Sequence, residues 1–123
     1  MSSIVHFDLP ADDLARAEAF YSELFGWKFT KYPGPMEYYL IETRTLGDEE
    51  GVRGGMGKRG APDQQIMPYF GVESVDTCLS EVTRLGGNVL LPKTAVPGFG
   101  YLAVCTDTEK NRFGVFEEDP GAR

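Results

Sequence analysis

The chain contains an imperfect internal repeat whose two copies lie about 60 residues apart. The first copy spans residues 5–27, and the second spans residues 68–87. Each opens on an alternating apolar segment and continues through an amphipathic segment, and the two copies close on Gly26-Trp27 and Gly86-Gly87. The similarity continues after these two segments, because Pro33-Gly34 recurs as Pro97-Gly98. A repeated half-length unit predicts a pseudo-symmetric fold, with a site where the two halves meet.

The length of 123 residues predicts a single domain over residues 1–123. A chain of this size can bury roughly two thirds of its unfolded surface, whereas a half of it would be marginal alone. We therefore expect the halves to share one sheet system. The predicted boundaries are a first module at about 3–59, a linker at 60–65 and a second module at about 66–118.

Charge and hydropathy exclude several classes of partner. The formal net charge is −7 and Lys and Arg form no stripe, so we expect no nucleic-acid binding, because phosphate repels an acidic surface. No apolar run approaches membrane-spanning length, and no secretion signal opens the chain, which predicts no membrane partner and a cytoplasmic location. In a reducing cytoplasm, Cys78 and Cys105 are expected to be two buried free thiols.

Periodicity predicts the element order βαβββ twice, which is the α+β class. Asp12 or Asp13 can cap the first helix and Gly26 can end it; Ser74 and Gly86-Gly87 do the same for the second. Pro10 is expected to end the first strand. The expected strands cover residues 4–9, 27–30, 37–43, 52–58, 66–72, 88–92, 100–106 and 112–118.

Strand alternation assigns side chains to the two faces of the sheet. Val5, Phe7 and Leu9 are apolar and should pack under the first helix, so His6 and Asp8 should point the opposite way. In the second half, the helix-facing residues are predicted to be Pro68, Phe70, Val72, Phe113 and Val115. The opposite face is predicted to carry Val52, Gly54, Met56, Met67, Tyr69, Gly71, Arg112, Gly114, Phe116 and Glu118.

This opposite face supplies the candidate site residues. His6, the only histidine, is either a hydrogen-bonded structural residue or a ligand-contacting acid or base, and Asp8 is the second candidate for proton transfer. Aromatic residues either line a pocket or make ordinary sheet packing, and Arg112 either binds an anionic group or makes a surface ion pair. The candidate ligand-binding residues are Met56, Tyr69, Phe99, Tyr101, Arg112 and Phe116.

The motifs of the chain resemble a known superfamily. Phe20-Tyr21-Ser22-Glu23-Leu24-Phe25-Gly26-Trp27 and residues 107–114, Asp-Thr-Glu-Lys-Asn-Arg-Phe-Gly, are similar to segments of the vicinal oxygen chelate superfamily of glyoxalases, bleomycin-resistance proteins and extradiol dioxygenases. The resemblance is greatest to small predicted enzymes related to lactoylglutathione lyase. It implies paired βαβββ modules that curl into a cup-shaped mixed sheet, with one divalent metal in the founding enzymes.

Of the metal ligands that this resemblance implies, the chain matches one. His6 occupies the position on the first strand, whereas the other positions fall at 54–56, at Met67 or Tyr69, and at Gly114. Zinc, nickel and iron sites use at least three N, O or S ligands. We therefore expect no metal and no other cofactor.

Three functions remain open from the sequence. The first is a protein that binds a small molecule, either without further chemistry or as a metal-independent lyase or isomerase that uses His6 or Asp8 for proton transfer. The second is non-catalytic sequestration of an antibiotic or metabolite. The third is a dimeric assembly module. A homodimer is expected in each case, because curled sheets leave strand edges to cover, with Phe99 and the turn at 33–35 near the rim.

Overall fold

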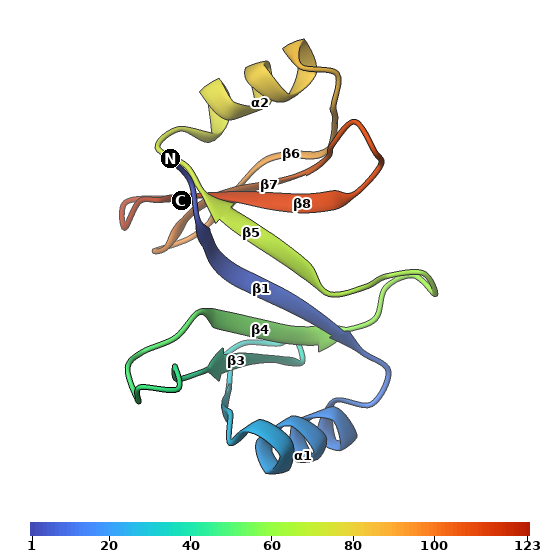
Figure 1. The fold of residues 1–123 in the computed structure, drawn as a ribbon, viewed down its shortest axis with the longest axis vertical. Coiled ribbons are helices and arrows are strands. Elements are labelled where there is room, and N and C mark those ends of the chain that lie inside the picture. The colour runs from blue at the N-terminus through green and yellow to red at the C-terminus, as the bar shows by residue number, and fades with distance from the viewer. The chain divides into compact units, whose positions relative to one another are not determined.

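The computed structural model describes residues 1–123 and contains eight strands and two helices in the order βαβββ, twice (Figure 1). This confirms the predicted α+β class with duplicated modules. The elements are β1 (Ile4–Ala11), α1 (Leu14–Phe25), β2 (Lys28–Lys31), β3 (Tyr38–Glu42), β4 (Arg53–Lys58), β5 (Met67–Gly71), α2 (Val75–Arg84), β6 (Asn88–Val96), β7 (Gly100–Thr106) and β8 (Arg112–Glu118).

The chain divides into two compact units. The first unit is His6–Ile66, and the second unit combines Met1–Val5 with Met67–Arg123. Strands of the first unit are ordered β2-β3-β4-β1, and those of the second unit are ordered β5-β8-β7-β6. In each unit one pair is parallel, β1 with β4 and β5 with β8, while the other pairs are antiparallel. Both sheets are therefore mixed.

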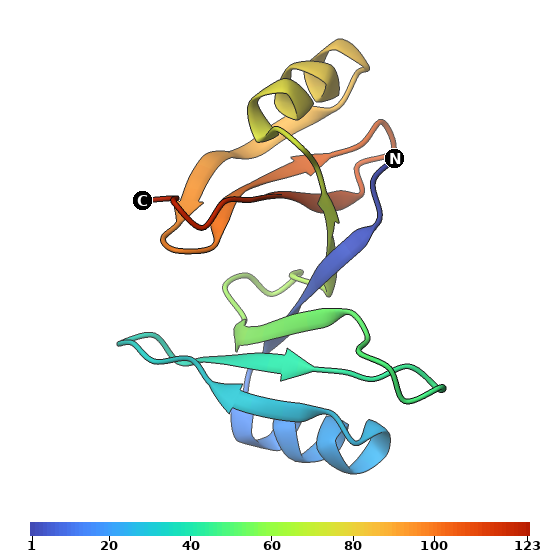
Figure 2. The same cartoon turned by 90° about the vertical axis from the view of Figure 1, so that its left-hand side faces the viewer.

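The core of the first unit lies between α1 and one face of its sheet, as Figures 1 and 2 show. Leu14 from the helix packs with Leu9, Ile41 and Met56 from three strands, and all four are buried. Phe7 packs against this cluster, which confirms that Phe7 and Leu9 face the helix. The prediction was wrong for Val5, which belongs to the second unit, where it lies against Gly71.

The core of the second unit forms in the same way beneath α2. Val75 of the helix packs with Ala103 and Val115 of the sheet, and Phe113 adds to the cluster, as the alternation predicted. Cys78 and Cys105 are both free thiols in this unit. Burial raises the pKa of each thiol, so both stay protonated near neutral pH.

Both helices begin at the predicted caps. The Asp13 carboxylate accepts a hydrogen bond from the Arg16 amide at 3.0 Å, and the Ser74 hydroxyl accepts one from the Thr77 amide at 3.2 Å. The first helix ends at Gly26, whose φ of 72° is a conformation that glycine adopts without a Cβ penalty. Local capping chemistry thus sets where each helix starts.

Two strands are longer than predicted, each because a proline does not end it. β1 continues through Pro10 to Ala11, in register with β4. β6 continues through Pro92 to Val96. Its register with β7 shifts between Leu91 and Thr94, and β6 is an edge strand. The edge position and the register shift accommodate Pro92 in β6, because the missing N–H of proline is not needed there.

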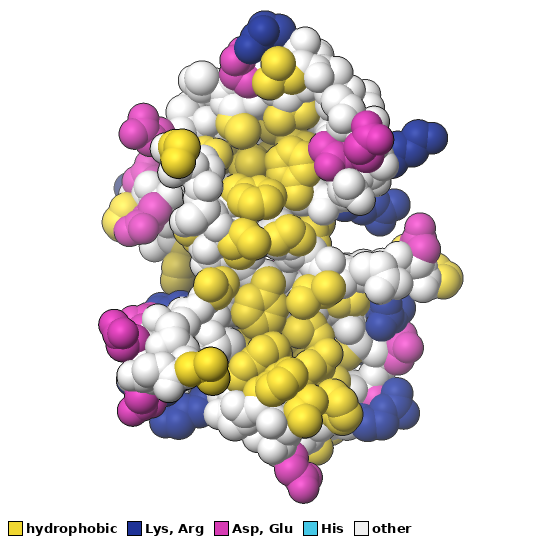
Figure 3. Space-filling view, viewed as in Figure 1, with side chains coloured by type: hydrophobic (Ala, Val, Ile, Leu, Met, Phe, Trp, Pro, Cys, Tyr) yellow, Lys and Arg dark blue, Asp and Glu magenta, His cyan; other side chains and the backbone are white.

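On the face shown in Figure 3, hydrophobic side chains gather toward the middle of each unit and charged side chains lie toward the edges. Exposed apolar residues include three on α1, namely Phe20, Leu24 and Phe25, and three on β6, namely Val89, Leu90 and Leu91. No helix has both the length and the apolar character that a membrane crossing requires.

A prediction concerns Gly114, which the ring of Tyr69 covers. A Cβ added at Gly114 would lie 2.3 Å from that ring, so Gly114→Ala forces the ring or the strand to move. Overpacking of this kind costs typically 1–3 kcal/mol. We expect Gly114→Ala to lower the free energy of unfolding by about 2 kcal/mol, measured by urea titration. Gly60→Ala, whose added Cβ would make only an ordinary 3.5 Å contact, is the control and should change it little. Equal stability of the two variants would contradict the packing described.

Candidate functional site

Asp8 is the centre of a hydrogen-bonded set on the face of the first unit's sheet that no helix covers, which we call the helix-free face. Its Oδ1 lies 3.2 Å from Nε2 of His6, on the same strand, and accepts a hydrogen bond of 3.0 Å from the Tyr38 hydroxyl. His6 and Asp8 are two residues apart on β1, so alternation places both on this face. Tyr38 comes from β3, and β4 lies between the two strands.

Tyr38 can reach Asp8 because β4 has glycine where the ring passes. Tyr38 is in register with Gly57, and Asp8 is in register with Gly55. A Cβ at Gly55 would lie 1.7 Å from the Tyr38 hydroxyl, and one at Gly57 would lie 3.1 Å from the ring. Any other residue at Gly55 would therefore occupy the place of the hydroxyl. Because Gly55 and Gly57 have no side chains, the Tyr38 ring can lie across β4 and reach Asp8 on the strand at its other side.

The chemistry of the His6–Asp8–Tyr38 set follows from its charges. An ionised carboxylate only accepts hydrogen bonds, so when the imidazole is neutral its proton lies on Nε2, facing Asp8. The side chains of His6 and Asp8 are 31% and 35% exposed, so both are accessible from solvent and partly desolvated. A carboxylate that fixes the orientation of an imidazole is an arrangement suited to proton transfer.

A hollow of about 390 Å³ lies beside this set in the first unit. Asp8, Tyr38 and Gly57 form part of its wall. Gln64 closes one side, held in place because its carbonyl oxygen accepts a hydrogen bond from Arg59 and its side chain accepts one from the Gly60 amide. The complete lining is Asp8, Leu9, Met36, Glu37, Tyr38, Gly57, Lys58 and Gln64.

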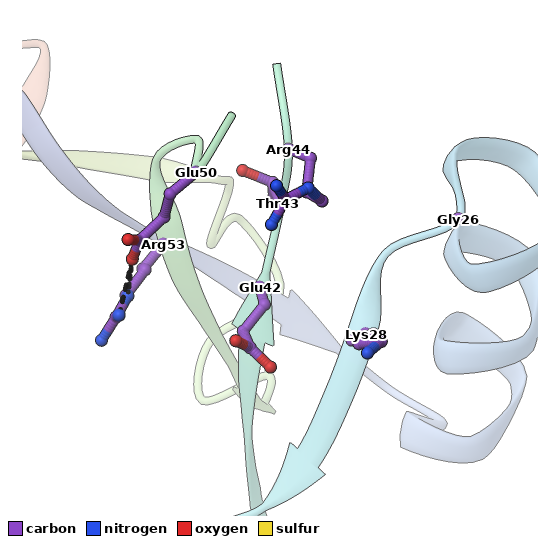
Figure 4. A pocket seen from close by; sticks show the side chains of 7 residues that line it. All are labelled: Gly26, Lys28, Glu42, Thr43, Arg44, Glu50 and Arg53. Atoms are coloured by element: carbon purple, nitrogen blue, oxygen red, sulfur yellow. Dashed lines mark hydrogen bonds and ion pairs between the residues drawn. The ribbon is translucent and has the colours of Figure 1, made fainter. Parts of the chain in front are cut away.

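A second hollow of about 230 Å³ lies at another part of the same unit and is lined by charges of both signs (Figure 4). Within the lining, Arg53 donates a 2.8 Å hydrogen bond to Glu50, and Arg44 donates at 2.7 Å to Asp48, which is not part of the lining. The full lining is Gly26, Lys28, Glu42, Thr43, Arg44, Glu50 and Arg53. Exposed ion pairs of this kind contribute little, and neither His6 nor Asp8 lies in this hollow.

Two of the residues predicted for the site lie on the helix side of the sheet, so their predicted face was wrong. Met56 is fully buried in the core beneath α1, and Tyr101 packs on the core beneath α2 with Lys93 4.4 Å from its ring centre. For Met56 the reason is a register error of one residue. Phe7 is in register with Gly54 and Phe70 with Val115, so Gly54 corresponds to Val115 and not to Gly114. A shift of one residue exchanges the two faces of a strand, and it also moves Gly54 to the helix side.

The remaining predicted residues lie in the second unit. Tyr69 is buried over Gly114, and Phe116 lies on the same face, with its ring close to Gly100. Phe99 is 53% exposed in the turn between β6 and β7, and Arg112 is exposed at the start of β8. The roles in ligand binding that the sequence predicts for these four residues remain predictions.

Sequence reasoning missed the specific role of Tyr38 and the contribution of Gln64. The sequence places Tyr38 among several aromatic residues with either a pocket or a packing role, and it places Gln64 in the linker at 60–65. The signal for Tyr38 was present in Gly54-Gly55-Met56-Gly57, since glycines on a strand mark the close approach of another group. The partner strand that supplies that group could not be read from spacing.

The metal that the resemblance implies does not fit the residues present. Gly54 and Gly55 have no side chain, and Met56 is enclosed in the core, so β4 offers no ligand at 54–56. Gly114 likewise offers none. No group of three or more His, Cys, Asp and Glu side chains in residues 1–123 is arranged to hold a metal ion. The expectation that no metal is bound stays a prediction.

Sequence comparison connects the chain with glyoxylase-like proteins. The family described as "Bleomycin resistance protein-like N-terminal" matches residues 3–44. The "Glyoxylase-like domain-containing protein" of Didymella fabae is 31% identical over 117 residues, covering 88% of each chain. "Putative glyoxylase CFP32" of Mycobacterium bovis is 29% identical over 115 residues, which cover 89% of this chain and 43% of that protein. The chain thus spans less than half the length of that relative.

Solved structures show the same fold at low sequence identity. Methylmalonyl-CoA epimerase in complex with methylmalonyl-CoA and NH4+ has a TM-score of 0.73 at 12% identity, covering 99% of this chain and 98% of that one. The epimerase of Mycobacterium tuberculosis has a TM-score of 0.68 at 10% identity, with 95% and 88% covered. The chain therefore belongs to the glyoxylase-like proteins of the vicinal oxygen chelate superfamily.

The metal prediction can be checked by elemental analysis of the dialysed chain. Because β4 and Gly114 supply no ligands, we expect less than one zinc, nickel or iron ion per ten chains. His6→Ala is the matched variant, and it should leave the metal content unchanged. Stoichiometric metal in the unsubstituted chain that disappears in His6→Ala would show that ligands other than those described complete a site.

The Tyr38–Asp8 hydrogen bond can be measured by a double-mutant cycle. Tyr38→Phe removes the hydroxyl and should cost about 1 kcal/mol of unfolding free energy, since the bond reaches a partly exposed carboxylate. Gly55→Ala displaces the same hydroxyl and should cost more, because the ring must also move. The double variant should lose about 1 kcal/mol less than the sum, because both changes remove the same bond. Tyr39→Phe, whose ring packs on the helix side, is the control; strict additivity would contradict the arrangement.

Proposed function

We propose that the chain is a small-molecule binding protein of the glyoxylase-like class that moves a proton on its ligand through the His6–Asp8–Tyr38 set. The observation that supports this most directly is the geometry at Asp8, whose Oδ1 contacts both His6 and Tyr38. An ordinary ion pair at a sheet surface does not require a tyrosine whose ring lies across the neighbouring strand. It also does not require two glycines that make room for this ring. This set uses both, so its geometry is specified by three strands.

The individual roles follow from the side chains. The Tyr38 hydroxyl and the His6 imidazole fix the position of the Asp8 carboxylate, and either Asp8 or His6 then accepts or returns a proton. The hollow beside Asp8 supplies a place for the reacting molecule. A solved protein of the same fold is an epimerase in complex with methylmalonyl-CoA, which supports a small organic molecule as the occupant. A metal-independent lyase or isomerase reaction is the chemistry that these residues can perform.

The second candidate is sequestration without catalysis. It is favoured by the match of residues 3–44 to the bleomycin-resistance-like family, because this segment includes His6, Asp8 and Tyr38. On this alternative the same residues bind the molecule and release it unchanged. The two functions differ only in whether a carbon-bound hydrogen of the ligand is exchanged with solvent.

The test begins with native mass spectrometry of the chain purified without denaturation. We expect a bound small molecule of one mass, lost in His6→Gln and Asp8→Asn and retained in the control Glu23→Gln, which removes one exposed carboxylate from α1. The released molecule is then incubated with the chain in D2O and followed by NMR. Proton transfer predicts exchange of a carbon-bound hydrogen, slowed by about 10²-fold or more in Asp8→Asn when both chains are compared at concentrations of the molecule that saturate them.

Each result has a defined meaning. Binding without exchange would replace proton transfer by sequestration. Failure to find any bound molecule, in a chain that retains its fold by circular dichroism, would overturn both and leave a dimeric assembly role. The homodimer itself stays a prediction, and light scattering would show it as twice the chain mass of 13.6 kDa.

A further inference from the structure

We propose that Asp8 is the residue of the set that contacts the ligand, and that the hollow beside it takes a small neutral or cationic molecule with an apolar body and a hydrogen-bond donor. This inference rests on the proposed function and makes it more specific. It assigns the position of the ligand, the group that recognises it and the chemical class that fits.

The choice of Asp8 follows from the lining of the hollow. Asp8 and Tyr38 both form part of its wall, whereas His6 does not. Both hydrogen bonds to Asp8 use Oδ1, and Oδ2 takes part in neither. A carboxylate has about four acceptor positions on its two oxygens, so Asp8 keeps acceptor capacity after binding His6 and Tyr38. His6 and Tyr38 then act as positioning residues.

The preference for an uncharged or positive ligand follows from the charges on the wall. Asp8 and Glu37 contribute two carboxylates, and the one ammonium group, that of Lys58, already donates to the carbonyl oxygen of Asp12 at 2.9 Å. Lys58 keeps its positive charge in that hydrogen bond, so the wall has two negative groups against one positive group, and the net charge of −7 on the whole chain disfavours an anion further. A donor group on the ligand, such as a hydroxyl or an ammonium, matches the Asp8 acceptor instead.

The expected apolar body follows from the rest of the lining. Met36 and the ring of Tyr38 provide hydrophobic surface beside the two carboxylates, whereas the side chain of Leu9 packs in the core beneath α1. Met36 is 69% exposed, and methionine adapts its shape readily to a neighbouring group. The Tyr38 ring can also attract a cation through its π face. These contacts favour a compact molecule with one polar end.

The test uses three probes that share one ring and differ in charge: benzyl alcohol, benzylamine and benzoate. In ¹H–¹⁵N NMR titrations of the whole chain, benzyl alcohol and benzylamine should shift the amide signals of Asp8, Tyr38 and Gly57. Benzoate should leave these signals in place. Asp8→Asn should weaken benzylamine binding at least fivefold, and Glu37→Gln should weaken benzylamine binding twofold or more while leaving benzyl alcohol unaffected. Glu23→Gln, the same chemical change outside the hollow, should leave all three titrations unchanged.

The outcomes separate this inference from the proposed function. Benzoate binding as tightly as benzylamine, shifts located elsewhere, or binding that is insensitive to Asp8→Asn would each overturn the inference. If native mass spectrometry still shows a bound molecule that depends on His6, the proposed function survives without it. A ¹⁵N measurement of the His6 side chain checks the His6–Asp8 contact independently, because Asp8→Ala removes the acceptor and should lower the preference of the imidazole proton for Nε2, whereas Glu37→Gln should preserve it.

Discussion

The contact of Tyr38 with Asp8 across β4 is the constraint on which the site depends. It requires glycine at position 55 of β4, a tyrosine on β3 at one side of this strand and a carboxylate on β1 at the other side. Glycine in a strand gives up side-chain packing and adds conformational entropy to the unfolded chain, so it weakens the sheet. In return the ring lies flat against the backbone and its hydroxyl meets Asp8. The Tyr38–Asp8 contact is thus possible only with a residue at position 55 that weakens the sheet.

The residues on the two faces of β4 make different kinds of contact. On the helix side, Met56 fills the core and the ring of Phe7 covers Gly54. On the helix-free face, Gly55 and Gly57 leave room for Tyr38 and for the hollow beside Asp8. Stability therefore comes mainly from the helix side, where apolar area is removed from water. Polar chemistry is confined to the other face, where His6 and Asp8 stay about one-third exposed.

Much of the fold followed from local physical signals. The Asp13 and Ser74 caps, the left-handed Gly26 and the alternation of Phe7 and Leu9 each depend on residues close in sequence. The extents of β1 and β6 were predicted too short because tolerance of proline depends on the neighbouring strand. The face of Met56 was predicted wrongly because aligning Gly54 with Gly114 shifted the register by one residue.

The sequence by itself determined the duplicated βαβββ order, the helix caps and the placement of His6 and Asp8 on one face of β1. These follow from period and local hydrogen bonding, which act over a few residues. Only the tertiary structure decided that Tyr38 is the partner of Asp8, that Met56 belongs to the core and that Gln64 closes the hollow. Each of these depends on the register of strands distant in sequence, and register is set by how both faces pack together.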